Sequence, residues 1–407
     1  MLKFALKNMA IKKTQVILVL ISIIISASVG VLAFNISSQV SDGITDNAGY
    51  YSLIVGPAGS KTQLAMNSMY FTEEPLGTIP YSVYTDIKKD QRVISAIPFA
   101  MADNYKGAGV VGTTSDYLKD KTLKAGQMFD DTSVLQAVVG ARVAKEHGLT
   151  IGSELHTSHS AIEGSEHKTP IVVVGILEET YSAFDKVVFT QLETLWHIHD
   201  HGGEGHEGEE HEGEEHEGEH HHENATICAV LVNTKNPSYA MQMVNEYDDM
   251  IYTHDEESCT LQAIEPMQIV RDVLSDADDT KYIVFVLCAI ILIMNVIIIS
   301  IITLLNMYHS AKEIALMRLI GISMKKINLL YLIQNGIIGA LSVVIAFAVS
   351  RLCLALAGDY VASMGVVLNV GRVYLPEIFI LLGVFLISVI PTVICTFVMA
   401  KRDSLAE

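Results

Sequence analysis

Four stretches of the chain carry no charged residue over a length that could cross a lipid bilayer. They are Thr14–Phe34, Tyr282–Tyr308, Ile327–Ser350 and Ile378–Ala400. A spanning helix needs about 20 consecutive apolar residues to cross roughly 30 Å of hydrocarbon, and each stretch meets that requirement. The sequence therefore predicts a multi-pass α-helical membrane protein with four transmembrane helices and a large α+β extracytoplasmic domain between the first and second. It excludes a small soluble enzyme.

The first apolar stretch has two interpretations. Basic residues precede it and small residues, Ser26–Ser28, lie near its end, as in a cleaved signal peptide. Its apolar core is longer than the roughly 7–15 residues of a typical signal peptide. We therefore expect this stretch to be retained as a membrane anchor.

Positive charges predict the orientation, because cytoplasmic loops are enriched in Lys and Arg. They gather before the first stretch, between the second and third, and after the fourth. Both termini are then cytoplasmic, in a protein of the plasma (inner) membrane. The predicted organisation is a cytoplasmic N-terminus (1–13), transmembrane helices at 14–34, 281–308, 327–356 and 377–400, an extracytoplasmic domain (35–280), a cytoplasmic loop with a short helix (309–326), a short outer loop (357–376) and a cytoplasmic C-terminus (401–407).

The predicted extracytoplasmic segment is strongly acidic. Residues 35–280 hold 14 Lys and Arg against 41 Asp and Glu, whereas the whole chain has a formal net charge of −19. Such a field attracts cations and repels nucleic acid. We therefore expect no nucleic-acid partner.

The same segment has the composition of a compact mixed α+β domain. Short β-branched runs alternate with helical patterns and turn residues. Strands are expected at Tyr51–Val55, Arg92–Ala96, Gly109–Gly112, Pro170–Ile176 and Ile227–Val232, and helices at Pro80–Lys89 and Ser238–Asp248. Ala137–Leu149 is expected to be a strand that leads into a helix through Gly140.

One segment departs from this alternation. His197–Glu223 contains nine His, ten Glu and six Gly, with His recurring every five residues from His201 to His216. This spacing does not place the histidines on one helical face, and a segment with almost no apolar residue cannot offset its ordering entropy. We predict a His/Glu-rich disordered loop between the strands near Val188 and Val230.

This segment is the clearest chemical signal in the sequence. Neutral imidazole is a good ligand for Zn²⁺, Ni²⁺ and Cu²⁺, and carboxylates add oxygen donors. The candidate metal ligands are His197, His199, His201, His206, His211, His216, His220, His221 and His222. His156, His159 and His167, on another stretch of the domain, could add ligands. The alternative is an acidic insertion that binds metals incidentally. No tightly bound cofactor and no catalytic residue is expected.

Three smaller features of the predicted extracytoplasmic segment carry weaker signals. Gly56–Thr62 resembles a phosphate loop but has the wrong spacing, so it is expected to be a tight turn or a helix entry. Cys228 and Cys259 either form a disulfide or remain free thiols. Trp196, the single tryptophan, is expected to anchor the loop that follows it.

The predicted cytoplasmic loop carries a recognisable motif. Ala311–Ser323 resembles the signature of FtsX/MacB-type ABC transporter permeases, and Ala400–Asp403 and Leu6–Asn8 are similar to flanking elements of that family. Leu53–Gly59, Gly77–Tyr84 and Val138–Ala144 resemble the MacB-like periplasmic core domain. Four spans with one large outer domain match the architecture of the family, and the resemblance covers essentially the whole chain.

The resemblance implies a mechanism. The permease would pair with a separate ABC ATPase subunit and with a second permease copy, in a homodimer surrounded by membrane lipid. Movement of the spans on ATP binding would reach the outer domain, an action termed mechanotransmission. The residues implied to couple with the ATPase are Lys312, Glu313, Ile314, Met317, Arg318 and Gly321. The alternative is that the basic residues of this loop only fix its cytoplasmic location.

The sequence does not determine the substrate. Some relatives with His-rich outer segments look associated with zinc acquisition, which favours a permease for zinc handling. An outer metal-binding or envelope protein is a further partner that this resemblance implies. The rivals are an exporter of peptides, lipids or antimicrobial compounds, and a non-transporting mechanotransmitter that activates a cell-envelope partner. A metal-buffering membrane protein without an ATPase is the least favoured, since it leaves the coupling motif without a use.

Overall fold

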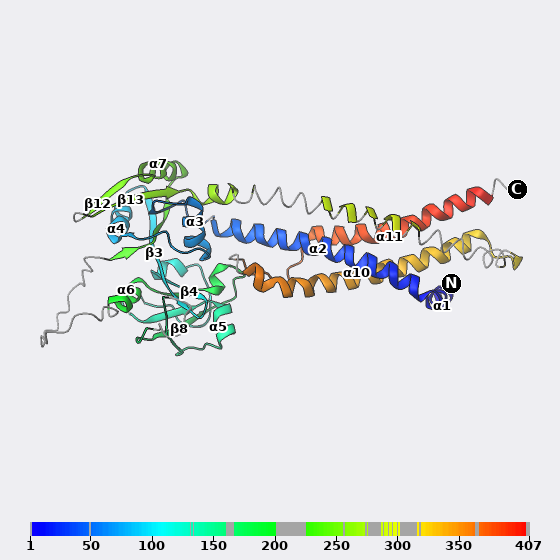
Figure 1. Ribbon diagram of the computed structural model, residues 1–407, viewed down its shortest axis with the longest axis horizontal. Coiled ribbons are helices and arrows are strands. Elements are labelled where there is room, and N and C mark those ends of the chain that lie inside the picture. Colours follow the sequence, from blue (N-terminus) through cyan, green and yellow to red (C-terminus); the bar gives the residue numbers. More distant parts are fainter. Residues whose placement is uncertain are drawn as a thin grey trace. The chain divides into compact units, whose positions relative to one another are not determined.

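The computed structural model divides into two compact units (Figure 1). The helical unit contains residues 1–40, 275–359 and 368–407, and the sheet unit contains residues 41–274 and 360–367. The structure describes residues 2–48, 50–159 except 131 and 133, 167–200, 225–254, 257–272 and 319–403 except 363–365, with short pieces between 275 and 316.

Long apolar helices form the helical unit. The helices with complete bounds are α1 (Leu2–Ile11), α2 (Lys13–Ala48), α10 (Met324–Ala362) and α11 (Leu375–Asp403). Among the described residues, Lys13–Thr45 and Lys326–Gly358 are long and apolar enough to cross a membrane, and Leu375–Ile390 is a shorter apolar segment. The prediction of four transmembrane helices is therefore supported for two of them and stays a prediction for the others.

Small residues let the helices of this unit pack closely, as is common in membrane bundles. Ala27 on α2 and Ala346 on α10 are fully buried, and the Ser28 hydroxyl donates a hydrogen bond to the Ala346 carbonyl at 3.1 Å. Leu18 and Leu352 on the same two helices stay more than half exposed. This pattern of small residues inside and large apolar residues outside fits a bundle whose outer surface faces lipid.

A polar cluster links three helices of the helical unit. The buried Glu377 carboxylate of α11 accepts hydrogen bonds from Asn35 of α2 and from the Arg351 guanidinium of α10. The Gln39 side-chain amide pairs with the backbone of Asn369, accepting from its N–H at 2.6 Å and donating to its carbonyl at 3.1 Å. Glu377 lies in the first turn of α11, and Arg351 directly follows the uncharged stretch Ile327–Ser350, so both charges lie outside the uncharged stretches.

A long mixed sheet organises the sheet unit, in the order β12-β13-β1-β11-β3-β4-β9-β6-β8-β5, with β7 on β8 and a separate β10-β2 pair. The strands are β1 (Leu53–Pro57), β2 (Ile79–Pro80), β3 (Val93–Tyr105), β4 (Ala108–Thr113), β5 (Leu123–Gly126), β6 (Gln136–Val139), β7 (Glu154–Leu155), β8 (Ile171–Leu177), β9 (Val188–Gln191), β10 (Thr226–Ile227), β11 (Ala229–Thr234), β12 (Ile251–His254) and β13 (Glu257–Ile264). The helices are α3 (Lys61–Tyr70), α4 (Tyr81–Lys89), α5 (Ala141–His147), α6 (Leu192–Asp200) and α7 (Pro237–Tyr247), with 3₁₀ turns η1 (Ser115–Leu118) and η2 (Ala183–Lys186).

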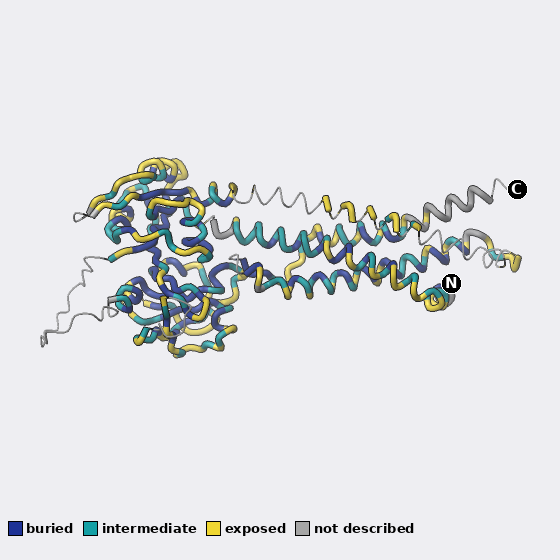
Figure 2. The backbone as a smooth tube through the Cα atoms, viewed as in Figure 1, coloured by how far each residue is buried: buried dark blue, intermediate teal, exposed yellow. Residues whose placement is uncertain are grey.

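Strand β3 joins two lobes of this sheet (Figure 1). Its first part, Val93–Phe99, pairs with β11, and its second part, Ala100–Tyr105, pairs with β4. We define the first lobe as the β11 side, with β2, β10, α3, α4 and α7, and the second lobe as the β4 side, with α5 and α6. Figure 2 shows buried residues along the sheet strands, where the apolar core lies.

Most predicted elements of this unit are present. The helices at 81–89 and 237–247, the strand at 171–177 and the strand–helix junction at Gly140 are confirmed. The run Ile227–Val232 is two strands, β10 and β11. The turn at Gly56–Thr62 is a helix entry, because the Ser60 hydroxyl caps α3 by accepting from the Gln63 N–H at 3.2 Å.

The cysteine alternatives are settled in favour of free thiols. Cys228 is buried and Cys259 is partly exposed, and neither forms a disulfide. Burial raises the pKa of the Cys228 thiol, so this side chain acts as an apolar packing group.

Candidate metal centre

Asp103 occupies an unusual position for a carboxylate, fully buried on a central strand. The pairing of β3 with β4 shifts between Met101, opposite Val111, and Asp103, opposite Val110, so Ala102 is an extra residue. A β-bulge of this kind bends a strand and redirects its side chains. It places Asp103 against the segment that follows β7.

Backbone pairing holds that segment in place. Asn104 and Ser158 exchange N–H to carbonyl hydrogen bonds of 2.8 and 2.9 Å, which sets His159 beside Asp103. The His167 N–H donates to the Thr157 carbonyl at 2.8 Å. His159 and His167 are therefore brought together although residues 160–166 separate them in the sequence, and their ring centroids lie 4.6 Å apart.

Helix α6 supplies a third histidine. Leu192, Leu195 and Ile198 bury one face of this helix. Gly112 on β4 allows the close approach, since a Cβ there would lie 2.6 Å from the Leu195 Cδ1. His199, in the last turn, points its Nε2 at Asp103 Oδ1 at 3.4 Å.

These four side chains form a candidate metal-binding group, called the metal centre below: Asp103, His159, His167 and His199. Their ligand atoms all lie within 4.8 Å of one another. His159 Nδ1 is 3.2 Å from Asp103 Oδ1, and His167 Nε2 is 3.5 Å from Oδ2. Ligands at about 2.0–2.2 Å from a tetrahedral Zn²⁺ lie about 3.3–3.6 Å apart, so the distances from His159 Nδ1 and from His199 Nε2 (3.4 Å) to Oδ1 are close to the edges of such a tetrahedron.

The hydrogen bonding of the metal centre also fits a cation. Asp103 Oδ1, His167 Nε2 and His199 Nε2 are buried and make no hydrogen bond. Buried polar atoms without partners are rare in folded proteins and usually mark a functional site. Asp103 Oδ2, by contrast, accepts a hydrogen bond from the Thr157 hydroxyl at 2.8 Å, which fixes the carboxylate and leaves Oδ1 free to coordinate.

Asp103 stays ionised in this environment. Burial raises its pKa, but the neighbouring His199 ring, the Thr157 hydroxyl and the His167 ring outweigh burial and hold the pKa below its ordinary value. The centre thus offers one carboxylate oxygen and three imidazole nitrogens, a donor set that suits Zn²⁺ and also Ni²⁺ or Cu²⁺.

The predicted ligands separate into three groups. His199, from the His/Glu-rich segment, joins His159 and His167 in the metal centre, whereas His156 and His197 do not belong to it. The remaining predicted ligands lie outside the described residues: His201, His206, His211, His216, His220, His221 and His222. Asp103 was not predicted, and the only signal for it is a carboxylate directly after the apolar run Ile97–Ala102.

The start of the predicted His/Glu-rich loop needs correction. Residues 197–200 are the last turn of α6, so the loop cannot begin at His197. The apolar residues Leu195 and Ile198 keep the chain helical this far. Trp196 does act as an anchor, because its Nε1 donates to the Thr226 carbonyl at 3.0 Å, just beyond the segment.

The predicted coupling motif is mostly outside the described residues, which include neither Lys312, Glu313, Ile314, Met317 nor Arg318. Gly321 is described, with φ of +88°, a left-handed conformation that favours glycine. Gly321 lies three residues before the start of α10 at Met324.

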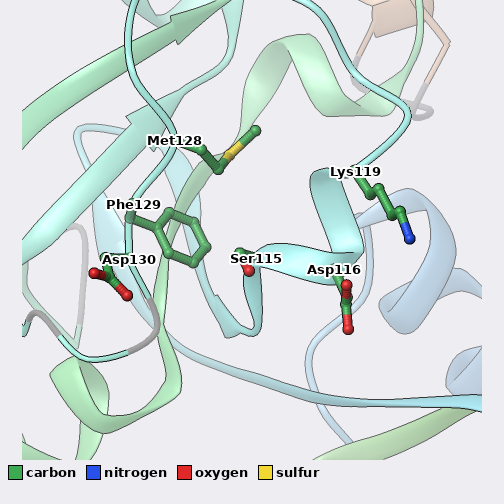
Figure 3. A pocket seen from close by; sticks show the side chains of 6 residues that line it. All are labelled: Ser115, Asp116, Lys119, Met128, Phe129 and Asp130. Carbon is green, nitrogen blue, oxygen red and sulfur yellow. The ribbon is translucent and has the colours of Figure 1, made fainter.

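A separate cleft of about 570 Å³ lies near η1 in the sheet unit (Figure 3). Its lining residues are Ser115, Asp116, Lys119, Met128, Phe129 and Asp130. The cleft shares no residue with the metal centre and contains no histidine. Its charged groups are two carboxylates and one lysine, so it lacks the imidazole donors of the metal centre.

Comparison with known proteins gives the family. A model of the MacB-like periplasmic core domain matches residues 16–247, and a model of the FtsX-like permease C-terminal domain matches residues 283–403. No curated protein matches the chain.

Two solved structures are similar to the chain at low identity. One is the periplasmic region of MacB from Actinobacillus actinomycetemcomitans, 11% identical, covering 56% of this chain and 97% of that chain, with a TM-score of 0.35. The other is the extracellular domain of YknZ, a noncanonic ABC-type transporter from Gram-positive bacteria, 13% identical, covering 52% and 98%, with a TM-score of 0.31. On the two family models, which together span most of the sequence, the chain belongs to the FtsX/MacB-type permeases of ABC transporters.

Proposed function

We propose that this chain is the membrane subunit of an ABC transporter that serves transition-metal handling, with zinc as the metal. The metal centre carries this proposal, because a buried carboxylate and three histidines converge with ligand atoms inside 4.8 Å. An acidic domain concentrates cations near such a site, and the histidines beyond α6 add further donors in the sequence.

The energy for this work comes from a separate ABC ATPase. The segment 309–326, with Met317 and Arg318, docks into the ATPase, and two permease copies form a homodimer. Both termini and this segment are cytoplasmic, and the sheet unit is extracytoplasmic. The membrane spans hold no ionisable residue near their centres, which favours work done by the sheet unit over passage of a hydrophilic ion between the helices.

Metal content and growth of cells that lack the protein test this function. We expect low cell zinc and poor growth under a zinc chelator, restored by the full-length chain and by a His147→Leu control. His147 is on α5 and packs on Tyr105, outside the metal centre. An Asp103→Asn chain, made at the same level, should not restore growth.

The outcome decides between the rival functions. If the null strain and the Asp103→Asn strain keep normal zinc content and growth, zinc handling is wrong. A defect in cell shape or lysis that zinc does not rescue would instead favour the mechanotransmitter of a cell-envelope partner. Export of peptides, lipids or antimicrobial compounds would appear as sensitivity to such compounds with normal zinc.

A further inference from the structure

We propose that the ion of the metal centre is a retained regulatory ligand that fixes helix α6 and, through Trp196, the junction between the two lobes of the sheet unit. The inference rests on the proposed function, since it gives the metal centre a regulatory role within a permease. It assigns the ion to control of movement and not to the cargo.

The number of ligands supports retention. Asp103, His159, His167 and His199 supply four donors, which complete a tetrahedral shell. Structural zinc sites have four protein ligands, whereas sites at which the metal must accept another molecule keep one position open. To leave this shell, the ion must exchange four protein bonds. Such a site suits an ion that stays bound while the protein works.

Burial indicates how the ion reaches the centre. Asp103 is fully buried, and the side chains of His167 and His199 are 12% and 32% exposed. The His159 side chain is 55% exposed. The ion therefore enters on the His159 side and binds to the buried Asp103 carboxylate. His159, as the most exposed ligand, is then the last side chain to close around the ion.

The ligands belong to separate elements of the second lobe. Asp103 is on β3, His159 and His167 are on the β7–β8 connection, and His199 is the only ligand on α6. Without an ion, the facing atoms Asp103 Oδ1, His167 Nε2 and His199 Nε2 have no hydrogen-bond partner. The ion thus adds the polar bonds that tie the end of α6 to the sheet.

Trp196 carries this restraint to the first lobe. It precedes His199 by three residues, and residues three apart lie on one side of a helix. Its Nε1 donates to the Thr226 carbonyl of β10, and its ring meets the Tyr81 ring of α4 edge to face at 5.2 Å. Tyr81 in turn donates its N–H to the Ala225 carbonyl at 2.9 Å. A shift of α6 would therefore change its contacts with both β10 and α4.

Trp196 also provides the assay, because it is the single tryptophan of the chain. We expect buffered Zn²⁺ added to the purified full-length protein to change Trp196 fluorescence in a saturable one-to-one titration. Zn²⁺ has no redox chemistry of its own. His147→Leu should titrate as the wild type does. Asp103→Asn should need at least about tenfold more zinc, the smallest loss expected from a metal-site substitution.

A deletion variant separates the metal centre from the neighbouring histidines. A chain that lacks residues 201–222 keeps all four ligands and should retain the Trp196 response at saturating zinc. If the response disappears on this deletion and persists in Asp103→Asn, the metal centre is not its origin, and the inference is overturned.

Coupling to the ATPase cycle is tested by linkage. In the complex of the full-length permease with its ATPase, the Kd for Zn²⁺ is measured without nucleotide and after vanadate trapping. A regulatory ion requires the two values to differ by about fivefold or more. Trp196→Leu, followed by calorimetry, should bring that ratio close to one while leaving resting zinc affinity unchanged. Equal Kd values in the two wild-type states would overturn the inference.

The proposed function and this inference fail in different ways. ATP-driven accumulation of radioactive zinc in proteoliposomes, with the ion of the metal centre released at each turnover, would make that ion cargo. The inference would then be wrong although zinc handling stands. A normal Trp196 response and normal coupling in a protein whose loss leaves cell zinc and growth unchanged would instead refute zinc handling.

Discussion

Replacement of His199 by leucine should lower the stability of the zinc-bound protein much more than that of the zinc-free protein. In the zinc-free protein, His199 Nε2 is buried and lacks a hydrogen-bond partner. Such an atom costs about 1–3 kcal/mol, and leucine removes it while favouring the helix slightly more than histidine does. Leucine also removes the ring whose Nε2 lies 3.4 Å from the buried Asp103 carboxylate and which helps to hold the pKa of Asp103 down. These effects oppose each other, so we expect the unfolding free energy of the zinc-free variant to stay within about 1 kcal/mol of the wild-type value.

Zinc should separate the stabilities of the two proteins. A ligand present at a hundred times its Kd stabilises the folded state by about 2.7 kcal/mol. For a domain of about 150–250 residues, this corresponds to a rise in Tm of about 5–11 °C. The His199→Leu protein retains three of four ligands, so most of this rise should be lost at the same zinc concentration.

Thermal unfolding of the full-length protein in detergent, with chelator or with buffered zinc, measures both effects. His147→Leu serves as the matched control and should keep the zinc-dependent rise. The reasoning would be refuted by a wild-type Tm that zinc does not change. It would also be refuted if His199→Leu lowered the zinc-free Tm by many degrees, since His199 would then be a packing residue.

Three further substitutions test other parts of the structure. Gly140→Ala should lower the unfolding free energy of the sheet unit by about 1–3 kcal/mol in chemical denaturation, because the new Cβ would lie 2.5 Å from the Asp185 carbonyl oxygen; unchanged stability would refute the tight β6–α5 junction. Arg351→Met should destabilise the helical unit by about 3–5 kcal/mol, measured by unfolding in detergent, because Glu377 then stays buried without its cationic partner. The double variant Arg351→Met, Glu377→Gln should recover part of that loss. Met317→Asp should abolish stimulation of the ATPase partner while expression and zinc binding persist; full stimulation would exclude docking through this residue.

The sequence predicts local structure in this chain better than it predicts the site. One strong local signal is sufficient to predict each of α4, α7 and β8. Pro80 precedes α4, Asn236 and Pro237 begin α7, and β8 is rich in β-branched residues. Helix α3 was only partly anticipated, since its capping serine stands in a glycine-rich segment that also resembles a phosphate loop.

The metal centre illustrates what a sequence pattern leaves out. The sequence predicts His199 as a ligand because it lies next to a dense run of histidines. It does not predict Asp103, since little in the local sequence distinguishes a liganding carboxylate from the other acidic residues of the domain. The bulge at Ala102 and the Asn104–Ser158 pairing bring the ligands together, and both depend on contacts between residues far apart in the sequence.

Preorganisation distinguishes the metal centre from the histidines that follow it in the sequence. Residues 201–222 offer imidazoles of the same chemistry, but their composition predicts a segment without a packed core, and ordering costs about 1–2 kcal/mol for each residue fixed. In the metal centre, β3, the β7–β8 connection and α6 already hold the four ligands in place, so less ordering entropy is lost when the ion binds. The metal centre should therefore fill at lower zinc concentrations than the segment. Calorimetry, which detects all bound zinc, should show two phases of binding to the full-length chain, whereas Trp196 fluorescence should follow only the tighter phase. Deletion of residues 201–222 should remove only the weaker phase.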